Sequence, residues 1–372
     1  MYTTNTTITI LGILAFFATS AQELTNVAPL PESLIESSGL HFLDGQLLSI
    51  QDSGNENKIF EIDSLNGNIL REVTIGNTVN TDWESITGDD NFIYIGDFGN
   101  NNGTRTDLKI FKIPMSEYLA DTSTQTAEII SFSYADQTGF ASSPFATNFD
   151  AEAFCSFGDS LLLFTKNWIN GYSKIYKLSK APGNYEVNVI DSINTEGFVT
   201  ACTCDPESGL IHLIGHNSIL APFAVRISDF SSNQITDGEI NRVELSSPIG
   251  QSAQIEGLSQ TYPGKFFVTS EALFNMEATL YELLWGIDLS TKNPQNLYLD
   301  GFISPNPSNG YFRVNIDDYS ELRIVDHQGK LVYESLKLHE YRINIAPGLY
   351  TLILTNRMKH KIASQRLVII NP

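Results

Sequence analysis

The stretch Lys58-Ile59-Phe60-Glu61-Ile62 returns in nearly the same form four more times along the chain. The later copies are Lys109-Ile110-Phe111-Lys112-Ile113, Lys174-Ile175-Tyr176-Lys177-Leu178, Ala224-Val225-Arg226-Ile227 and Leu280-Tyr281-Glu282-Leu283. Their central residues are 51, 65, 49 and 56 positions apart. A period of about 50 residues in a chain of short apolar strands is typical of a β-propeller or a similar array. Because one small sheet cannot bury both of its faces alone, the copies are expected to pack around a common axis.

Each copy belongs to a longer unit that opens with a strand carrying an acidic residue. These openings are Glu36-Ser37-Ser38-Gly39-Leu40, Asp82-Trp83-Glu84-Ser85-Ile86, Asp150-Ala151-Glu152-Ala153-Phe154 and Gln254-Ile255-Glu256-Gly257-Leu258, with Val199-Thr200-Ala201 in the fourth unit. A second apolar strand and a polar loop follow. Short apolar runs separated by Gly, Asn, Asp and Pro predict strands throughout. The sequence therefore predicts an all-β chain: a five-bladed β-propeller followed by a small C-terminal β-sandwich.

The fifth unit lacks room for an outer strand of its own. Residues 69–75 and 128–134 fit that place in the first two units, but little sequence remains after Tyr281. The segment from Glu23 to Leu30 precedes the first unit as the outer strands precede the later ones. We expect it to complete the last blade, because a closed ring leaves no exposed sheet edge.

The N-terminus reads as an export signal. An apolar run from Ile8 to Phe17 is followed by Ala18-Thr19-Ser20-Ala21. The run is too short to cross a bilayer as a helix, so residues 1–21 are predicted to be a signal peptide. No other candidate transmembrane span is visible. We expect the propeller to cover residues 22–300 and the last domain residues 301–372.

The charge of the body limits the class of partner that it can bind. Residues 301–372 hold nine Lys/Arg and six Asp/Glu, which leaves 13 Lys/Arg against 37 Asp/Glu before residue 301. A body this acidic repels phosphate backbones, so nucleic acid is not expected as a partner.

The three cysteines, Cys155, Cys202 and Cys204, are too few for a disulfide framework. Pairing of Cys155 with one of the other two across neighbouring blades stays open.

The tail has its own pattern. It begins with Ser304-Pro305-Asn306-Pro307-Ser308-Asn309-Gly310 and continues as short alternating strands, which predict a small sandwich. With Asp326-His327-Gln328-Gly329-Lys330-Leu331-Val332, Pro347-Gly348-Leu349-Tyr350 and Arg366-Leu367-Val368-Ile369, it resembles the C-terminal sorting domain of type IX secretion. The resemblance implies that the type IX translocon reads residues 301–372. The protein would then be secreted or placed on the outer cell surface, with signal peptide and sorting domain removed.

The body also resembles a known group. The Ser-Gly-Leu or Glu-Gly-Leu strands, the Asp-x-Glu starts, Asp97-Phe98-Gly99-Asn100 and the Lys-Ile-Phe-x-Ile strands are similar to secreted bacterial β-propellers of the SdiA-regulated, NHL-like family. The resemblance covers about residues 25–295. It implies five blades, calcium binding in some members and no established reaction.

The repeat predicts one acidic opening. The innermost strands start at one rim, and the antiparallel second strands end there. Ten positions converge on this rim: the strand starts Glu36, Glu84, Glu152, Thr200 and Glu256, and the strand ends Asp52, Asp97, Lys166, His216 and Glu271. Seven of them are carboxylates, and two carboxylates about 7 Å apart repel by roughly 2 kcal/mol at an effective dielectric constant near 20. We therefore expect water, internal cations, raised pKa values or a bound metal at this rim.

Two interpretations of the opening follow. The seven carboxylates form a candidate calcium site, because hard oxygen ligands suit calcium, or they form a solvated structural rim. Lys166, Trp168 and His216 are candidates for contacting a glycan or peptide ligand. The sequence lacks the common hydrolase, metalloprotease and nucleotide-binding motifs. The function expected first is a secreted or cell-surface binding or scaffold module; the alternative is an extracellular glycosidase-like or phytase-like hydrolase that uses the rim carboxylates.

Overall fold

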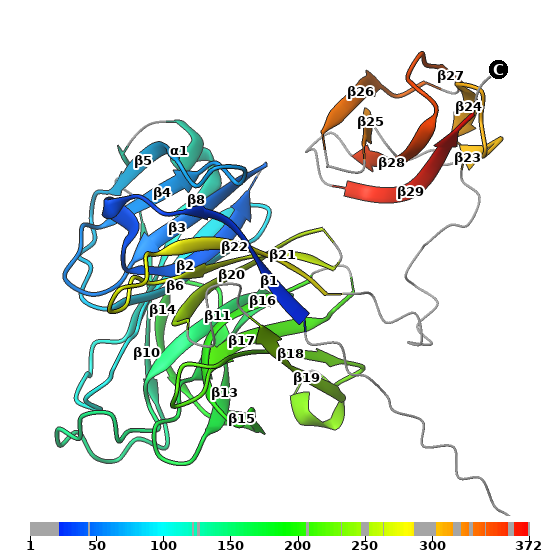
Figure 1. Cartoon of the computed structure of the whole chain (residues 1–372). Helices are drawn as coiled ribbons and strands as arrows, with labels where there is room; N and C mark the ends of the chain where they lie inside the picture. Colours follow the sequence, from blue (N-terminus) through cyan, green and yellow to red (C-terminus); the bar gives the residue numbers. More distant parts are fainter. Residues whose placement is uncertain are drawn as a thin grey trace, which may run out of the picture. The chain divides into compact units, whose positions relative to one another are not determined.

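The computed structural model describes residues 22–285 and 303–370, apart from residues 44, 121–122, 125–126, 206–207, 232, 247–252, 263, 315–320, 327–329, 339 and 356–360. The chain divides into two compact units, Met1–Ile287 and Asp288–Pro372 (Figure 1). The predicted signal peptide and the predicted boundary at residue 300 lie outside the described residues.

The first unit is almost all β and is built from antiparallel four-stranded meanders. Within the described residues there are five. The first is β2 (Ser37–Leu43), β3 (Gln46–Gln51), β4 (Lys58–Ile62) and β5 (Ile69–Ile75); the second is β6 (Trp83–Gly88), β7 (Phe92–Asp97), β8 (Lys109–Pro114) and β10 (Glu128–Tyr134). The third is β11 (Ala151–Phe157), β12 (Ser160–Thr165), β13 (Tyr172–Ser179) and β15 (Val189–Asn194). The fourth is β16 (Phe198–Cys204), β17 (Ile211–His216), β18 (Pro222–Ser228) and β19 (Glu239–Ser246).

The fifth meander takes its outer strand from the other end of the unit. It consists of β20 (Ile255–Tyr262), β21 (Lys265–Ser270), β22 (Thr279–Leu284) and β1 (Gln22–Pro29). Strand β1 runs antiparallel to β22, with Leu24 opposite Leu283, and also pairs in parallel with β19 of the fourth meander. The prediction that the segment before Leu30 completes the last sheet is confirmed.

A few short strands and helical turns lie outside the meanders. Strand β9 (Ser123–Thr124) pairs with β5, and β14 (Gly183–Val187) pairs with β10, both in parallel. Helix α1 (Met115–Ala120) follows β8, and single 3-10 turns cover Glu32–Leu34 and Ile235–Asp237. No helix in the described part of the chain is long and apolar enough to cross a membrane.

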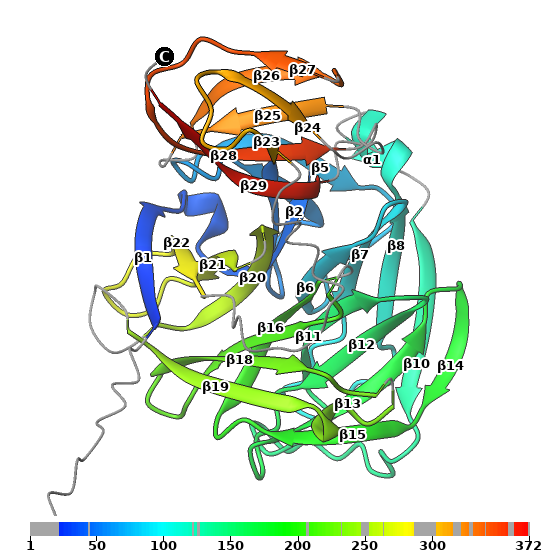
Figure 2. The same ribbon diagram turned by 90° about the vertical axis from the view of Figure 1, so that its right-hand side faces the viewer.

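The five first strands form a closed cycle of contacts. Strand β2 contacts β6, β6 contacts β11, β11 contacts β16, β16 contacts β20, and β20 returns to β2. Figure 2 shows these five strands next to one another in the middle of the unit. The arrangement is propeller-like.

The core lies between neighbouring meanders. The repeated strands β4, β8, β13, β18 and β22 place Phe60, Phe111, Tyr176, Val225 and Tyr281 in it, each at most 3% exposed. Separate apolar clusters join the first meander to the second, the second to the third, and so on, including one between the fifth and the first. Since burying one large apolar side chain contributes about 1.5–3 kcal/mol, the aromatic repeat supplies much of the packing at each interface.

A disulfide also joins two meanders. Cys155 on β11 is bonded to Cys204 on β16, while Cys202 is a buried free thiol. The pairing that the sequence left open is therefore with Cys204.

The second unit is a pair of antiparallel sheets. One contains β23 (Ile303–Ser304), β24 (Tyr311–Val314) and β27 (Glu340–Arg342); the other contains β26 (Leu331–Leu336), β25 (Glu321–Val325), β28 (Gly348–Thr355) and β29 (Lys361–Ile369). One apolar cluster takes side chains from both sheets, among them Phe312, Tyr341, Leu322 and Leu352.

Candidate functional site

A β-bulge occurs at the same place in the first strand of each meander. These five innermost strands are β2, β6, β11, β16 and β20. The pairing register shifts between Ser37 and Gly39, Trp83 and Ser85, Ala151 and Ala153, Val199 and Ala201, and Ile255 and Gly257. The extra residues are Ser38, Glu84, Glu152, Thr200 and Glu256. A bulge leaves one residue out of the ladder and re-aims its side chain, so this position is the structural origin of the site.

The bulges correct the alignment of the first repeat. Ser38, not Glu36, stands where Glu84 stands in the second meander. Glu36 lies two residues earlier, in the place of Asp82; it is exposed, and its Oε2 accepts a hydrogen bond of 2.6 Å from Asn55 Nδ2. The prediction that Glu36 starts the innermost strand beside the other glutamates was wrong, because Ser38-Gly39-Leu40 takes the place of Glu256-Gly257-Leu258 and leaves Glu36 two residues too early.

Small residues at the bulge connect meanders instead of lining an opening. Ser38 Oγ donates a hydrogen bond of 2.8 Å to the carbonyl oxygen of Trp83 in the next meander. Thr200 Oγ1 donates one of 2.5 Å to the carbonyl oxygen of Ile255, the equivalent contact between the fourth and fifth meanders. A hydroxyl side chain at the bulge therefore bonds to the neighbouring innermost strand, whereas a glutamate there does not make this bond.

The carboxylates of the other bulges line a cavity of about 330 Å³. Eight of the residues singled out from the sequence line it: Asp52, Glu84, Glu152, Lys166, Trp168, His216, Glu256 and Glu271. The remaining lining residues are Asn101, Phe145, Phe198, Asn217, Ser218, Leu220 and Gln254. We call this cavity the axial pocket.

Asp97 does not line the axial pocket. It is fully buried, with Arg105 Nη2 at 2.9 Å from Oδ1 and Lys109 Nζ at 3.6 Å from Oδ2. Its Oδ1 also accepts a hydrogen bond of 3.1 Å from the backbone N–H of Asp82. Asp97 was predicted as a metal ligand, but these two cations compensate its charge, so it acts as a structural ion pair.

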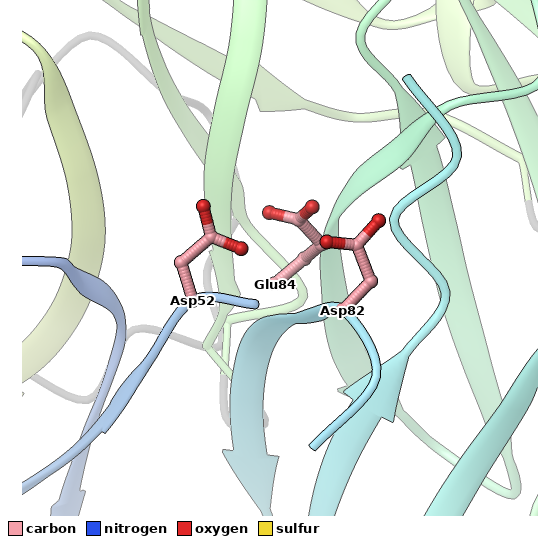
Figure 3. Close-up of side chains that lie close together, drawn as sticks. All are labelled: Asp52, Asp82 and Glu84. Atoms are coloured by element: carbon pink, nitrogen blue, oxygen red, sulfur yellow. The ribbon is translucent and has the colours of Figure 1, made fainter. Parts of the chain in front are cut away.

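Two groups of carboxylates share Glu84. Oxygens of Asp52, Asp82 and Glu84 all lie within 4.8 Å of one another, and so do oxygens of Glu84, Asp150 and Glu152. Figure 3 shows the first group, in which Asp52 comes from one segment and Asp82 and Glu84 come from another. Asp82 and Asp150 were not among the predicted site residues. The signal that could have found them is the repeated Asp-x-Glu at residues 82–84 and 150–152.

Glu84 is the least compensated member of these groups. Its side chain is buried, and among the described residues no hydrogen bond or ion pair reaches its carboxylate. A Cβ at Gly99 would overlap Glu84 Oε1 and Asp82 Oδ2, so the glycine leaves room for both carboxylates. A buried charge without a partner is costly, which makes Glu84 the strongest indication that the pocket receives a cation.

Asp150 connects the carboxylates to the aromatic side of the pocket. Its Oδ1 accepts a hydrogen bond of 2.6 Å from the backbone N–H of Asn100, and its Oδ2 accepts one of 2.7 Å from Trp168 Nε1. These contacts fix the indole ring at the pocket wall.

Lys166 supplies the positive charge inside the axial pocket. Its Nζ lies 3.1 Å from Glu152 Oε1 and 3.9 Å from Glu256 Oε1, and 5.1 Å from the centre of the Trp168 ring. Burial works against the charged ammonium, but Glu152 and Glu256 outweigh it and raise the pKa of Lys166. No other lysine or arginine is among the residues that line the pocket.

The pocket disfavours ionised carboxyl groups. Burial, reinforced by Glu152 and Asp52, raises the pKa of Glu84. Burial and then Asp52 raise the pKa of Asp82 to about 7, and burial and then Glu256 raise the pKa of Glu271 to about 9. A positively charged ligand would relieve both causes.

His216 is a neutral acceptor in this pocket. Its Nδ1 is 3.0 Å from the carbonyl oxygen of Asn217, and because a carbonyl can only accept, Nδ1 carries the proton. Its Nε2 is buried and has no hydrogen-bond partner among the described residues. Burial and then the nearby Lys166 ammonium lower the pKa of His216 to about 4.

Comparison with known proteins identifies the second unit. Residues 303–370 match the family described as "Secretion system C-terminal sorting domain". The match indicates export by type IX secretion toward the cell surface or the outside, and it implies an interaction with that secretion system. No curated protein matches the chain.

Solved structures give only distant similarity. One match is a chain of the "Mitotic Checkpoint Complex", with 12% identity and a TM-score of 0.33. It covers 67% of the present chain and 62% of the matched chain, so the present chain spans less than two thirds of that chain's length. It is 10% identical to a "glucose dehydrogenase" (TM-score 0.37, 70% and 98% covered) and to a "Quinonprotein alcohol dehydrogenase-like protein" from Bacteroides thetaiotaomicron (TM-score 0.33, 91% and 69% covered). Scores this low carry no argument about function.

Proposed function

We propose that the protein is an exported binding module: a five-bladed β-propeller whose axial pocket holds a divalent cation, with calcium as the best fit. The cyclic contacts of β2, β6, β11, β16 and β20 support the five-bladed ring. The two sheets that share one apolar cluster in the second unit support a C-terminal sandwich. In this proposal the sorting domain is removed at export, and the propeller is released or kept on the cell surface.

The observation that carries the cation is the position of Glu84. It belongs to both carboxylate groups, and its charge has no partner among the described residues. The positive charge that lines the pocket, Lys166, already pairs with Glu152 and Glu256. Calcium takes six to eight oxygen ligands in flexible geometry, which suits carboxylates from different loops. Asp52, Asp82 and Glu84, with Asp150 and Glu152 beside them, would hold the ion.

Substitution of Glu84 tests the cation. We expect millimolar calcium to raise the Tm of the exported protein by about 5 °C or more. Calcium at 100 times its Kd stabilises the folded state by about 2.7 kcal/mol, and each kcal/mol moves Tm by about 2–4 °C at this size. Glu84→Gln should remove most of the rise. Glu186→Gln, which changes an exposed carboxylate on β14 outside the pocket, is the matched control and should keep it.

Differential scanning fluorimetry with EDTA and with calcium gives this result directly, and metal analysis of protein purified without chelator supports it. Identical melting curves with and without calcium in the unaltered protein would remove the cation from the proposal. Turnover of aryl glycosides or phosphomonoesters that is lost in Glu84→Gln would favour the hydrolase instead.

A further inference from the structure

One side of the axial pocket is a row of aromatic rings. Phe145 and Trp168 have ring centres 5.1 Å apart, Trp168 and Phe198 4.7 Å, and Phe198 and His216 5.9 Å. All four residues line the pocket, and Asp150 holds the Trp168 ring through its Nε1. The faces of such rings attract cations and planar guanidinium groups.

The loops around the pocket expose large apolar side chains. Phe274 is 91% exposed, Ile219 72%, Phe145 63% and Ile169 59%. Three of them follow a pocket residue by three positions: Ile169 after Lys166, Ile219 after His216, and Phe274 after Glu271. Several large exposed apolar side chains close together mark a protein interaction site, and contacts that surround a central anchor exclude water from it.

Two of these residues hold an unfavourable backbone conformation. Phe145 has a φ of 51° and Phe274 a φ of 56°, in the left-handed region where glycine is the easier choice. Phenylalanine at these positions exposes most of each ring to solvent, in Phe145 on the pocket wall and in Phe274 three residues after Glu271. We call Phe145, Ile169, Ile219 and Phe274 the apolar rim.

The charge inside the rim selects the group that can enter. Glu271 Oε2 accepts a hydrogen bond of 2.6 Å from Gln254 Nε2, and no ion pair with a described lysine or arginine reaches it, so it holds a proton that an entering cation would displace. Glu256 shares Lys166 with Glu152 and is the more distant partner, at 3.9 Å against 3.1 Å. Neither Glu256 nor Glu271 belongs to the two carboxylate groups assigned to the cation. A second positive charge is therefore complementary to this side of the pocket.

His216 adds a requirement for a hydrogen-bond donor. It is 5% exposed, it lines the pocket, and its Nε2 lone pair has no partner among the described residues. A guanidinium group meets these conditions together, because it is positively charged, planar and carries five N–H donors. A saccharide could stack on Trp168 and donate a hydroxyl, but it would bring no positive charge to Glu271 and would leave the apolar rim without a partner.

We propose that the partner is a polypeptide that inserts an arginine side chain into the axial pocket, beside the aromatic row and toward Glu256 and Glu271, while apolar neighbours of that arginine pack on the apolar rim. This inference rests on the proposed binding function and names its partner. It does not depend on the cation, because a different set of carboxylates carries it.

Calorimetric titration with short peptides tests the arginine. The probe is acetyl-Leu-Arg-Leu-amide added to the exported protein in 1 mM calcium, and the matched probe replaces arginine by citrulline, which has the same shape without the charge. We expect the arginine peptide to bind at least tenfold more tightly than the citrulline peptide. Glu271→Gln should weaken the arginine peptide at least fivefold, with circular dichroism used to show that the variant is folded.

The apolar rim is tested separately. Phe274→Ser should weaken acetyl-Leu-Arg-Leu-amide several-fold but leave acetyl-Gly-Arg-Gly-amide and the calcium-induced rise in Tm unchanged. This variant changes a side chain that is almost fully exposed, so a failure to fold is not expected, and the calcium response confirms it in the same sample.

The outcomes separate this inference from the proposed cation. Calcium stabilisation with equal affinity for the arginine and citrulline peptides, or with no binding of either, overturns the arginine and leaves the cation. Arginine-selective binding in a protein indifferent to calcium supports the arginine and removes the cation. Binding of cellobiose that is lost in Glu271→Gln, with no binding of the arginine peptide, assigns the pocket to saccharides and overturns the inference.

Discussion

The start of β6 brings two acidic residues, Asp82 and Glu84, to the site. The bulge at Glu84 takes that residue out of the β6–β7 ladder, and Asp82 lies two residues earlier with a backbone N–H bound to Asp97. Burial and neighbouring carboxylates raise the pKa of both carboxyl groups. A cation and a proton therefore compete for the same oxygens.

This competition predicts a pH dependence of calcium binding. Because the pKa of Asp82 is raised to about 7, its protonation alone should weaken calcium about tenfold between pH 8 and pH 6. The weakening should follow the titration of the cation-free pocket and be measurable by calorimetry at constant ionic strength. An affinity that is constant over this range would show that Asp82 is not a ligand.

The stability of the cation-free protein should change in the opposite direction. The pKa of Asp82 is raised on folding, so between its ordinary value of 3.8 and about 7 the folded chain keeps a proton that the unfolded chain has released. Stability that is present at acidic pH is therefore lost as the pH rises toward 7. With EDTA, the contribution of this group makes Tm lower at pH 7.5 than at pH 5.5, and calcium should reduce that difference.

At the residue scale, strand alternation is enough to find most of the site. Asp52, Lys166, His216 and Glu271 could be predicted because the ends of second strands meet the starts of first strands at one rim. Glu36 and Asp97 could not be excluded from the sequence alone. Glu36 lies two residues before the bulge position, which Ser38 occupies, and Asp97 pairs with Arg105, which comes from a loop.

At the scale of the element, the third strand of each meander carries the clearest sequence signal of the fold. Its large apolar residue fills the space between neighbouring meanders. The bulge has a signal too: the residue after it is always small, namely Gly39, Ser85, Ala153, Ala201 and Gly257. A Cβ at Gly39 would lie 2.8 Å from the backbone nitrogen of Ile86 in the next meander. Innermost strands approach most closely there, so only small side chains fit.

The disulfide between elements predicts a stability effect. Cys155 and Cys204 are separated by 49 residues, and a cross-link over a loop of this length stabilises by about 2–4 kcal/mol. The double change Cys155→Ser and Cys204→Ser should lower the free energy of unfolding by that amount in urea denaturation. Reductant should destabilise the unaltered protein similarly and have no effect on the variant. If reductant destabilises both equally, the bond contributes nothing.

At the scale of the whole molecule, the ring contains the pocket and the tail contains the export signal. The ring could be predicted from the period of about 50 residues, and its closure from the shortage of chain after Tyr281. The pairing of β1 with β22 confirms the closure. The pocket could only be outlined, because its aromatic row includes Phe145, which lies in a loop outside the repeat, and Phe198, which takes the place that Asp82 and Asp150 have in other meanders.

The tail predicts where the protein accumulates. A chain that lacks residues 303–370 should remain inside the cell envelope, because the segment that matches the sorting domain is absent. Fractionation and immunoblotting of culture medium, surface and periplasm measure this. Glu84→Gln in the full chain is the control and should be exported as usual. Appearance of the truncated chain in the medium would contradict the assignment.

The pairing of Leu24 with Leu283 also decides how the propeller is presented to its surroundings. Strand β22 begins at Thr279, beside the loop that carries Glu271, and runs away from the pocket to Leu284. The chain therefore arrives and departs at the base of the ring, about 17 Å of strand below the mouth. A tether attached at either end of this unit would therefore start on the side of the ring opposite the mouth.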